Sequence, residues 1–182
     1  MILRRALVGL SALLLTANQA VPAGKTLPEC HIHQSKPVSF RNTTAQDILE
    51  ISIGTGPCYL ATLVIVIRDA ETGHVLYSYV APFKQHVIEQ SDDPELPQSA
   101  ATFVSSETAV GTSMTNELPP YLEPEAYQEQ HSQSILVSKG EYEALRAKPR
   151  PMFSHATYYE GWRIVVIDDT TGMGKAIVEG GV

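Results

Sequence analysis

The residue types with the clearest chemical potential lie near the N-terminus, where Cys30 is followed by His31 and His33. Side chains alternate along an extended segment, so His31 and His33 would point in the same direction. Two imidazoles on one strand face can bind Zn²⁺ or Cu²⁺ together, but a complete site needs one or two further ligands. No other histidine lies at a paired spacing. We therefore expect no cofactor, and a zinc or copper site at His31 and His33 is the alternative.

The residue types of a hydrolase triad also occur in the chain, because Ser154 and His155 precede Asp168 and Asp169. Adjacency in sequence says nothing about geometry, and no oxyanion donor is indicated. The chain lacks a Gly-x-Ser-x-Gly elbow, a His-Glu-x-x-His motif, a Cys-x-x-Cys pair and a glycine-rich phosphate loop. These patterns favour a protein that is not an enzyme, with a small exported hydrolase as an alternative.

Aromatic residues form a third group of candidates. Tyr77 and Tyr79 would share one face of a strand, and Tyr158, Tyr159 and Trp162 follow later in the chain. Aromatic side chains supply much of the binding energy of protein interfaces. If the face that carries Tyr77 and Tyr79 is exposed, these five residues are candidates for a binding surface. The alternative is ordinary packing within the core and the sheet.

The spacing of apolar residues predicts the elements that position these groups. Alternation over 48–53 predicts a strand with one buried face, and the apolar run 59–67 predicts a central strand covered on both faces. Ser138 and Glu141 form a capping box for a helix that ends before Pro149. Further strands are predicted over 74–80, 134–137, 162–167 and 175–179. We expect an α+β fold, a mainly antiparallel sheet of about five or six strands with one or two short helices; an all-β sandwich is the alternative.

Two of the predicted hairpins resemble each other in sequence. Residues 65–69 are followed by Thr72 and Gly73, and residues 164–168 are followed by Thr171 and Gly172. The resemblance could reflect a duplicated β unit. We favour the simpler explanation that a hairpin of this kind requires Asp, Thr and Gly at these positions of its turn.

The stretch 91–125 has a different composition from the rest of the chain. It is rich in proline, serine, threonine and acidic residues, and only 101–104 resembles a short strand. Proline removes backbone donors, and this composition offers little apolar surface to bury. We therefore expect a long, mobile proline-rich loop, either functional or a linker.

The first residues have the layout of a secretory signal peptide. Arg4 and Arg5 precede an apolar run over 6–17, and small residues follow up to Ala20 and Ala23. The run is too short to cross a bilayer as a helix, and no later segment is apolar enough to span one. We predict a signal peptide over 1–23, cleaved after Ala20 or Ala23 by general secretion, and a single small exported domain over 24–182.

Charge and cysteine content limit the function further. The chain has 13 basic and 20 acidic residues, so its net charge is −7, and removal of two arginines with the signal peptide leaves 11 minus 20, or −9. Such a charge argues against nucleic acid as a partner. In an oxidising compartment Cys30 and Cys58 should form a disulfide. We expect a periplasmic or extracellular binding protein whose partner is another protein or envelope macromolecule.

Overall fold

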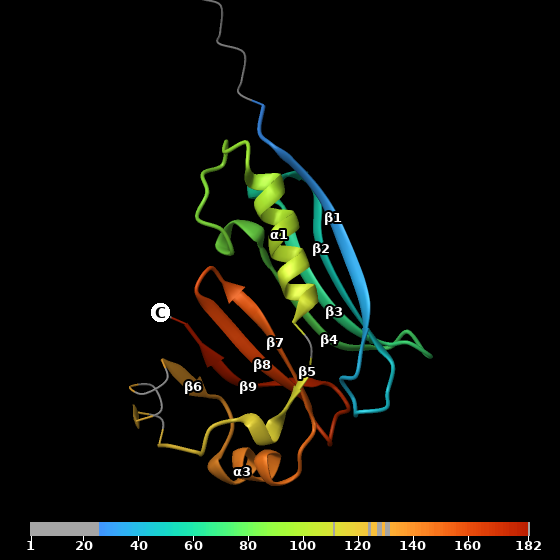
Figure 1. The fold of residues 1–182 in the computed structure, drawn as a ribbon, viewed down its shortest axis with the longest axis vertical. Helices are drawn as coiled ribbons and strands as arrows, with labels where there is room; N and C mark the ends of the chain where they lie inside the picture. The colour runs from blue at the N-terminus through green and yellow to red at the C-terminus, as the bar shows by residue number, and fades with distance from the viewer. Residues whose placement is uncertain (1–25, 111, 124, 127–128, 130–131, 182) are drawn as a thin grey trace, which may run out of the picture.

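The computed structural model describes residues 26–181 except 111, 124, 127–128 and 130–131. The predicted signal peptide over 1–23 therefore lies outside the described residues. In the described part, nine strands form two antiparallel sheets, accompanied by two α-helices, α1 and α3. The α+β class is confirmed, but the strands are more numerous than five or six. They form two sheets because each helix covers the apolar face of a different one (Figure 1).

The first sheet is a four-stranded meander in the order β1-β2-β3-β4. Its strands are β1 (Glu29–Val38), β2 (Asp47–Pro57), β3 (Thr62–Asp69) and β4 (Val75–Pro82). Alternate residues of β2, namely Leu49, Ile51 and Ile53, are buried. Every second residue of β3, starting at Leu63, is buried as well. The central position predicted for the 59–67 run is correct. The strand begins only at Thr62, because Cys58–Leu60 forms a 3-10 turn, and its outer face is partly exposed.

Helix α1 (Leu96–Ala109) covers the inner face of this sheet and corrects the expected loop over 91–125. The predicted strand over 101–104 is wrong, since these residues lie inside the helix. Leu96, Ala100 and Val104 recur every four residues and are fully buried against β1 and β2. This is the spacing of one helix face. Proline is tolerated in the first turn, where its missing N–H has no intrahelical acceptor.

The second sheet has the order β5-β7-β8-β9-β6. Its strands are β5 (Thr112–Met114), β6 (Gln133–Ile135), β7 (Pro151–Tyr158), β8 (Gly161–Ile167) and β9 (Gly174–Gly180). Helix α3 (Lys139–Ala147) packs on one face through Tyr142 and Leu145. Its capping residue is as predicted: the Ser138 Oγ accepts a hydrogen bond from the Glu141 N–H at 3.3 Å.

A disulfide joins Cys30 to Cys58, as the sequence predicts. The Cα atoms of the two cysteines are 4.8 Å apart. The bond ties the start of edge strand β1 to the turn that follows β2. A disulfide of this kind is compatible with an exported protein. In the described residues, neither helix has the length and apolar composition needed to cross a membrane.

Candidate functional site

Tyr77 and Tyr79 point inward from β4, between the two sheets. The Tyr77 hydroxyl lies 2.6 Å from the His155 Nε2 atom of β7, and the Tyr79 hydroxyl donates to the Thr157 carbonyl at 2.6 Å. Tyr77 is buried and Tyr79 is half-buried. The condition for a binding surface on this face of β4 is therefore not met. Both tyrosines instead fasten the edge of the first sheet to the second.

His155, which the hydrolase alternative invoked, is the centre of this junction. Its side chain is only 2% exposed, and its ring stacks on Phe153 and tilts against both tyrosines. Its Nδ1 atom lies 2.8 Å from the Ala156 carbonyl, so Nδ1 carries the proton and Nε2 accepts from Tyr77. Burial lowers the pKa of His155 to about 4, and burial also raises the pKa of Tyr77. Both groups are therefore neutral at physiological pH.

Two further ionisable residues border the junction. His86 is buried and meets the rings of Tyr79 and Phe103 edge-on, and burial lowers the pKa of His86 against the opposing effect of nearby backbone groups. Glu107 of α1 accepts a hydrogen bond from the Ala156 N–H at 2.9 Å, and burial raises its pKa. Neither ring nitrogen of His86 has a hydrogen-bond partner in the described part of the chain. The junction thus collects acid–base residue types in a packed setting.

The other members of the hydrolase alternative do not join His155. Asp168 lies in the turn after β8, where its Oδ1 atom accepts from the Thr170 and Thr171 N–H groups. Asp169 pairs with Arg150 at 2.7 Å. Asp168 thus binds N–H groups of its own turn and Asp169 binds an arginine. The two ring nitrogens of His155 are hydrogen-bonded to Tyr77 and to the backbone instead. The structure shows no Ser-His-Asp arrangement among these residues.

His31 and His33 are both exposed on one face of β1, as alternation predicts. The His31 Nδ1 atom lies 3.1 Å from the Thr55 hydroxyl. Cys30 is in the disulfide and is no longer a ligand. In the part of the chain that the structure describes, no group of three or more His, Cys, Asp or Glu side chains could hold a metal ion. The zinc or copper alternative therefore lacks its further ligands there.

Tyr158, Tyr159 and Trp162 lie at the turn between β7 and β8. Tyr158 is 40% exposed and Tyr159 is 53% exposed, whereas Trp162 is half-buried. The Tyr158 ring approaches Gly161 so closely that a Cβ atom built there would lie 2.0 Å from it. Glycine is therefore required at this turn to let the ring fold back. The two tyrosines remain available on the surface.

Other apolar side chains are exposed in the segments that adjoin this turn, namely Leu60 (68%) and Ile88 (71%). The backbone connects their segments: the Phe83 N–H donates to the Ala61 carbonyl at 2.9 Å, and the Tyr159 N–H donates to the Gln85 carbonyl at 2.7 Å. Figure 1 shows the orange β7–β8 turn beside the green segment that follows β4. We call the set Leu60, Ile88, Tyr158 and Tyr159 the aromatic end.

An acidic hollow adjoins the aromatic end. It has a volume of about 510 Å³. Its lining consists of Ile88, Glu89, Gln90, Asp92, Asp93 and Pro94. Ile88 belongs to both features, so exposed apolar surface and carboxylates meet there. The sequence patterns single out the tyrosines of the turn as candidates but give no signal for Leu60 and Ile88, which lie in two other segments.

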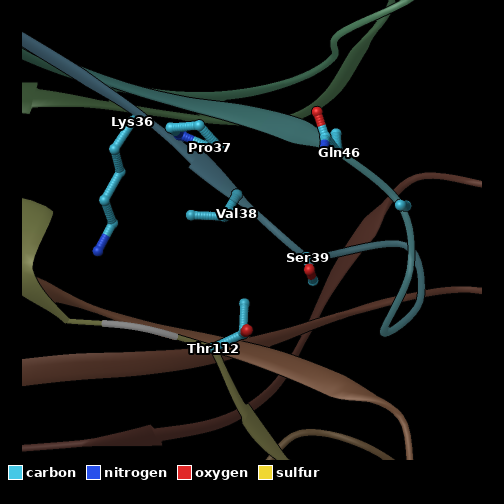
Figure 2. Close-up of a pocket in the computed structure, with 7 residues that line it drawn as sticks. Lys36, Pro37, Val38, Ser39, Gln46 and Thr112 are labelled. Atoms are coloured by element: carbon cyan, nitrogen blue, oxygen red, sulfur yellow. The ribbon is translucent and has the colours of Figure 1, made fainter.

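A second hollow, of about 380 Å³, lies between the edge strands of the two sheets. Figure 2 shows Lys36 and Val38 of β1 on one side and Thr112 of β5 on the other. The Lys36 Nζ atom donates to the Val110 carbonyl at 3.1 Å, so it ties β1 to the end of α1. Lys36 is the only ionisable residue in the lining of this hollow. This hollow therefore offers no cluster of ionisable groups among its described lining residues.

Comparisons with known proteins supply no relative for this chain. No family model matches the sequence, and neither a curated protein nor a solved structure matches it.

Proposed function

We propose that this chain is an exported, non-enzymatic binding protein whose aromatic end docks a polypeptide partner. The observation that carries the proposal is the gathering of exposed apolar side chains from three separate segments at one end of the molecule. Exposed groups of apolar side chains commonly mark sites of protein interaction. Export is supported by the signal-like leader and by the Cys30–Cys58 disulfide.

The chemistry of the surface suggests the kind of partner. Glu89, Asp92 and Asp93 line the hollow beside Ile88, and the net charge of the whole chain is −7. A segment that carries lysine or arginine next to apolar side chains would complement this surface. Its charges would speed the encounter, and its apolar side chains would supply most of the affinity. The association should therefore weaken as salt screens the charges.

The test uses a peptide of alternating lysine and leucine as a probe, with a glutamate–leucine peptide as its counterpart. The double variant Leu60→Ser/Tyr159→Ser should bind the lysine peptide more than about tenfold less tightly, because a buried aromatic anchor is often worth 2 kcal/mol or more. Leu136→Ser is the matched control, since Leu136 is also exposed but lies after β6 in the second sheet. Fluorescence anisotropy at low and high salt measures the affinities.

Two outcomes would contradict the proposal. One is equal affinity of the double variant and the wild-type protein for the lysine peptide, with both proteins folded. The other is a loss of binding on replacement of His31 and His33, with no effect of Leu60→Ser/Tyr159→Ser. The second result would favour the metal-binding alternative over the aromatic end.

A further inference from the structure

Three basic side chains gather in a small hollow on the side of the molecule away from the aromatic end. The hollow has a volume of about 180 Å³. Its lining consists of Phe40, Arg41, Lys148, Pro149, Arg150, Pro151, Ile167 and Asp169. The basic residues come from the segment after β1 and from the segment between α3 and β7. Three carboxylates, Asp47, Asp69 and Asp169, pair with the two arginines, so the hollow gathers cationic donors without a net positive charge.

Arg41 is held rigidly at one side of the hollow. Its Nε atom donates to Asp47 at 2.6 Å, and its Nη1 and Nη2 atoms donate to Asp69 at 2.7 and 3.1 Å. The Asp47 side chain is fully buried. A guanidinium has five N–H donors, so these three bonds leave one donor on each Nη atom. Arg41 is therefore positioned by two carboxylates and still has hydrogen-bonding capacity.

Arg150 offers the better-shaped donor pair. Its Nη1 atom donates to Asp169 at 2.7 Å and to the Ile167 carbonyl at 3.3 Å. Its Nε atom is buried and has no hydrogen-bond partner in the described residues. The Nε and Nη2 edge of a guanidinium matches the two oxygens of a carboxylate or a phosphate. A buried N–H donor without an acceptor costs free energy. An acceptor that bound this Nε–H group would remove that cost.

Lys148 and Asp169 also line the hollow, and their charges are opposite. The hydrogen bond from Arg150 lowers the pKa of Asp169, with a small further effect from the charge of Lys148, which is exposed. The Asp169 side chain is 77% exposed, unlike the buried carboxylates that hold Arg41. An ion pair with an exposed carboxylate contributes little stability, so replacement of Asp169 should leave the fold intact.

We propose that this hollow binds an anionic oxygen group, a carboxylate or a phosphate, and that the negative charge of Asp169, which holds Nη1 of Arg150, opposes this binding. The incoming group would take the Nε and Nη2 donors of Arg150. Lys148 would add a second positive charge beside it. The site is separate from the aromatic end, so it does not depend on the proposed docking function.

The experiment is a titration of the folded protein with inorganic phosphate and, separately, with acetate, at constant ionic strength. The side-chain Nε–H resonance of Arg150 is followed by NMR. We expect it to shift and saturate with at least one of the two anions, and the tighter of them identifies the ligand class. Asp169→Asn should tighten binding about fivefold, because removal of one exposed charge at contact distance is worth about that factor in water.

Lys148→Ala should weaken binding by a similar factor. Lys139→Ala is the matched control, since Lys139 is an exposed lysine of α3 that faces Glu123 instead. Thermal unfolding confirms that each variant is folded. An Arg150 resonance that does not move with either anion would overturn the proposal. So would equal affinities of the wild-type protein and the Asp169→Asn and Lys148→Ala variants.

Discussion

Acid should weaken the junction between the two sheets, because His155 would then have to accept a proton inside it. His155 has its pKa lowered by burial from an ordinary value of 6.5 to about 4. In the unfolded chain the imidazole takes up a proton below about pH 6.5. In the folded chain it stays neutral until about pH 4. Its contribution to stability is therefore complete above pH 6.5 and is lost as the pH falls towards 4.

The size of the effect follows from the same values. One pKa unit corresponds to about 1.36 kcal/mol. The fall in the pKa of His155 from 6.5 to about 4 therefore corresponds to roughly 3 kcal/mol of unfolding free energy, a large share of the total for a small domain. His86 acts in the same direction, since its pKa is also lowered by burial, whereas Glu107 acts against it because its pKa is raised. Arg163, paired with Glu179, adds a repulsive charge for the imidazolium.

The contribution of His155 is isolated by comparing two variants. Tyr77→Phe removes the hydroxyl that bonds to the imidazole but keeps the titrating group. Tyr77→Phe/His155→Phe removes both and leaves no orphaned donor. Urea unfolding at pH 7 and at pH 4 gives the free energies. Between these pH values Tyr77→Phe should lose about 3 kcal/mol more than the double variant. Equal losses in the two variants would show that His155 is not the titrating group, and the reasoning would fail.

Two further predictions concern the stability of the first sheet and its helix. Replacement of Cys30 and Cys58 by serine should lower the unfolding free energy by about 3.5 kcal/mol, because the bond closes a loop with a sequence separation of 28; urea unfolding measures it. Leu96→Ala should cost about 2–5 kcal/mol, because Leu96 is fully buried; an effect below 1 kcal/mol would mean that α1 does not pack on the first sheet.

The sequence predicts those strands whose central inner positions are apolar. Every second residue over 49–53 of β2 and over 63–67 of β3 is isoleucine or leucine, and the predicted strands over 48–53 and 59–67 overlap both. β1 was not predicted as a strand, since Gln34 and Lys36 occupy positions on its inner face, paired with Ile51 and Leu49. Helix α1 was missed because its buried stripe includes Ala100 and is surrounded by serine and threonine. The four-residue spacing of Leu96, Ala100 and Val104 becomes visible only when Leu96 is included.

The candidate site was predictable only in part. Alternation shows that Tyr77 and Tyr79 share a face of β4, but it does not show which face the second sheet covers. His155 and Thr157 are buried on the same face of β7 as Phe153, but both are polar, so the sequence shows no apolar alternation that would predict this strand. The aromatic end draws on segments that are distant in sequence, and no local pattern connects them.

The two similar hairpins explain why local features were predicted better than the junction. The Gly73 N–H donates to the Asp69 carbonyl at 2.9 Å, and the Gly172 N–H donates to the Asp168 carbonyl at 2.8 Å. Both glycines have positive φ, 71° and 70°, which a residue with a side chain rarely adopts. Each turn thus satisfies its own requirements within five residues, so the same residue types recur wherever the turn does. The Tyr77–His155 hydrogen bond has no such local cause, because 78 residues separate its partners and only the docking of two complete sheets brings them together.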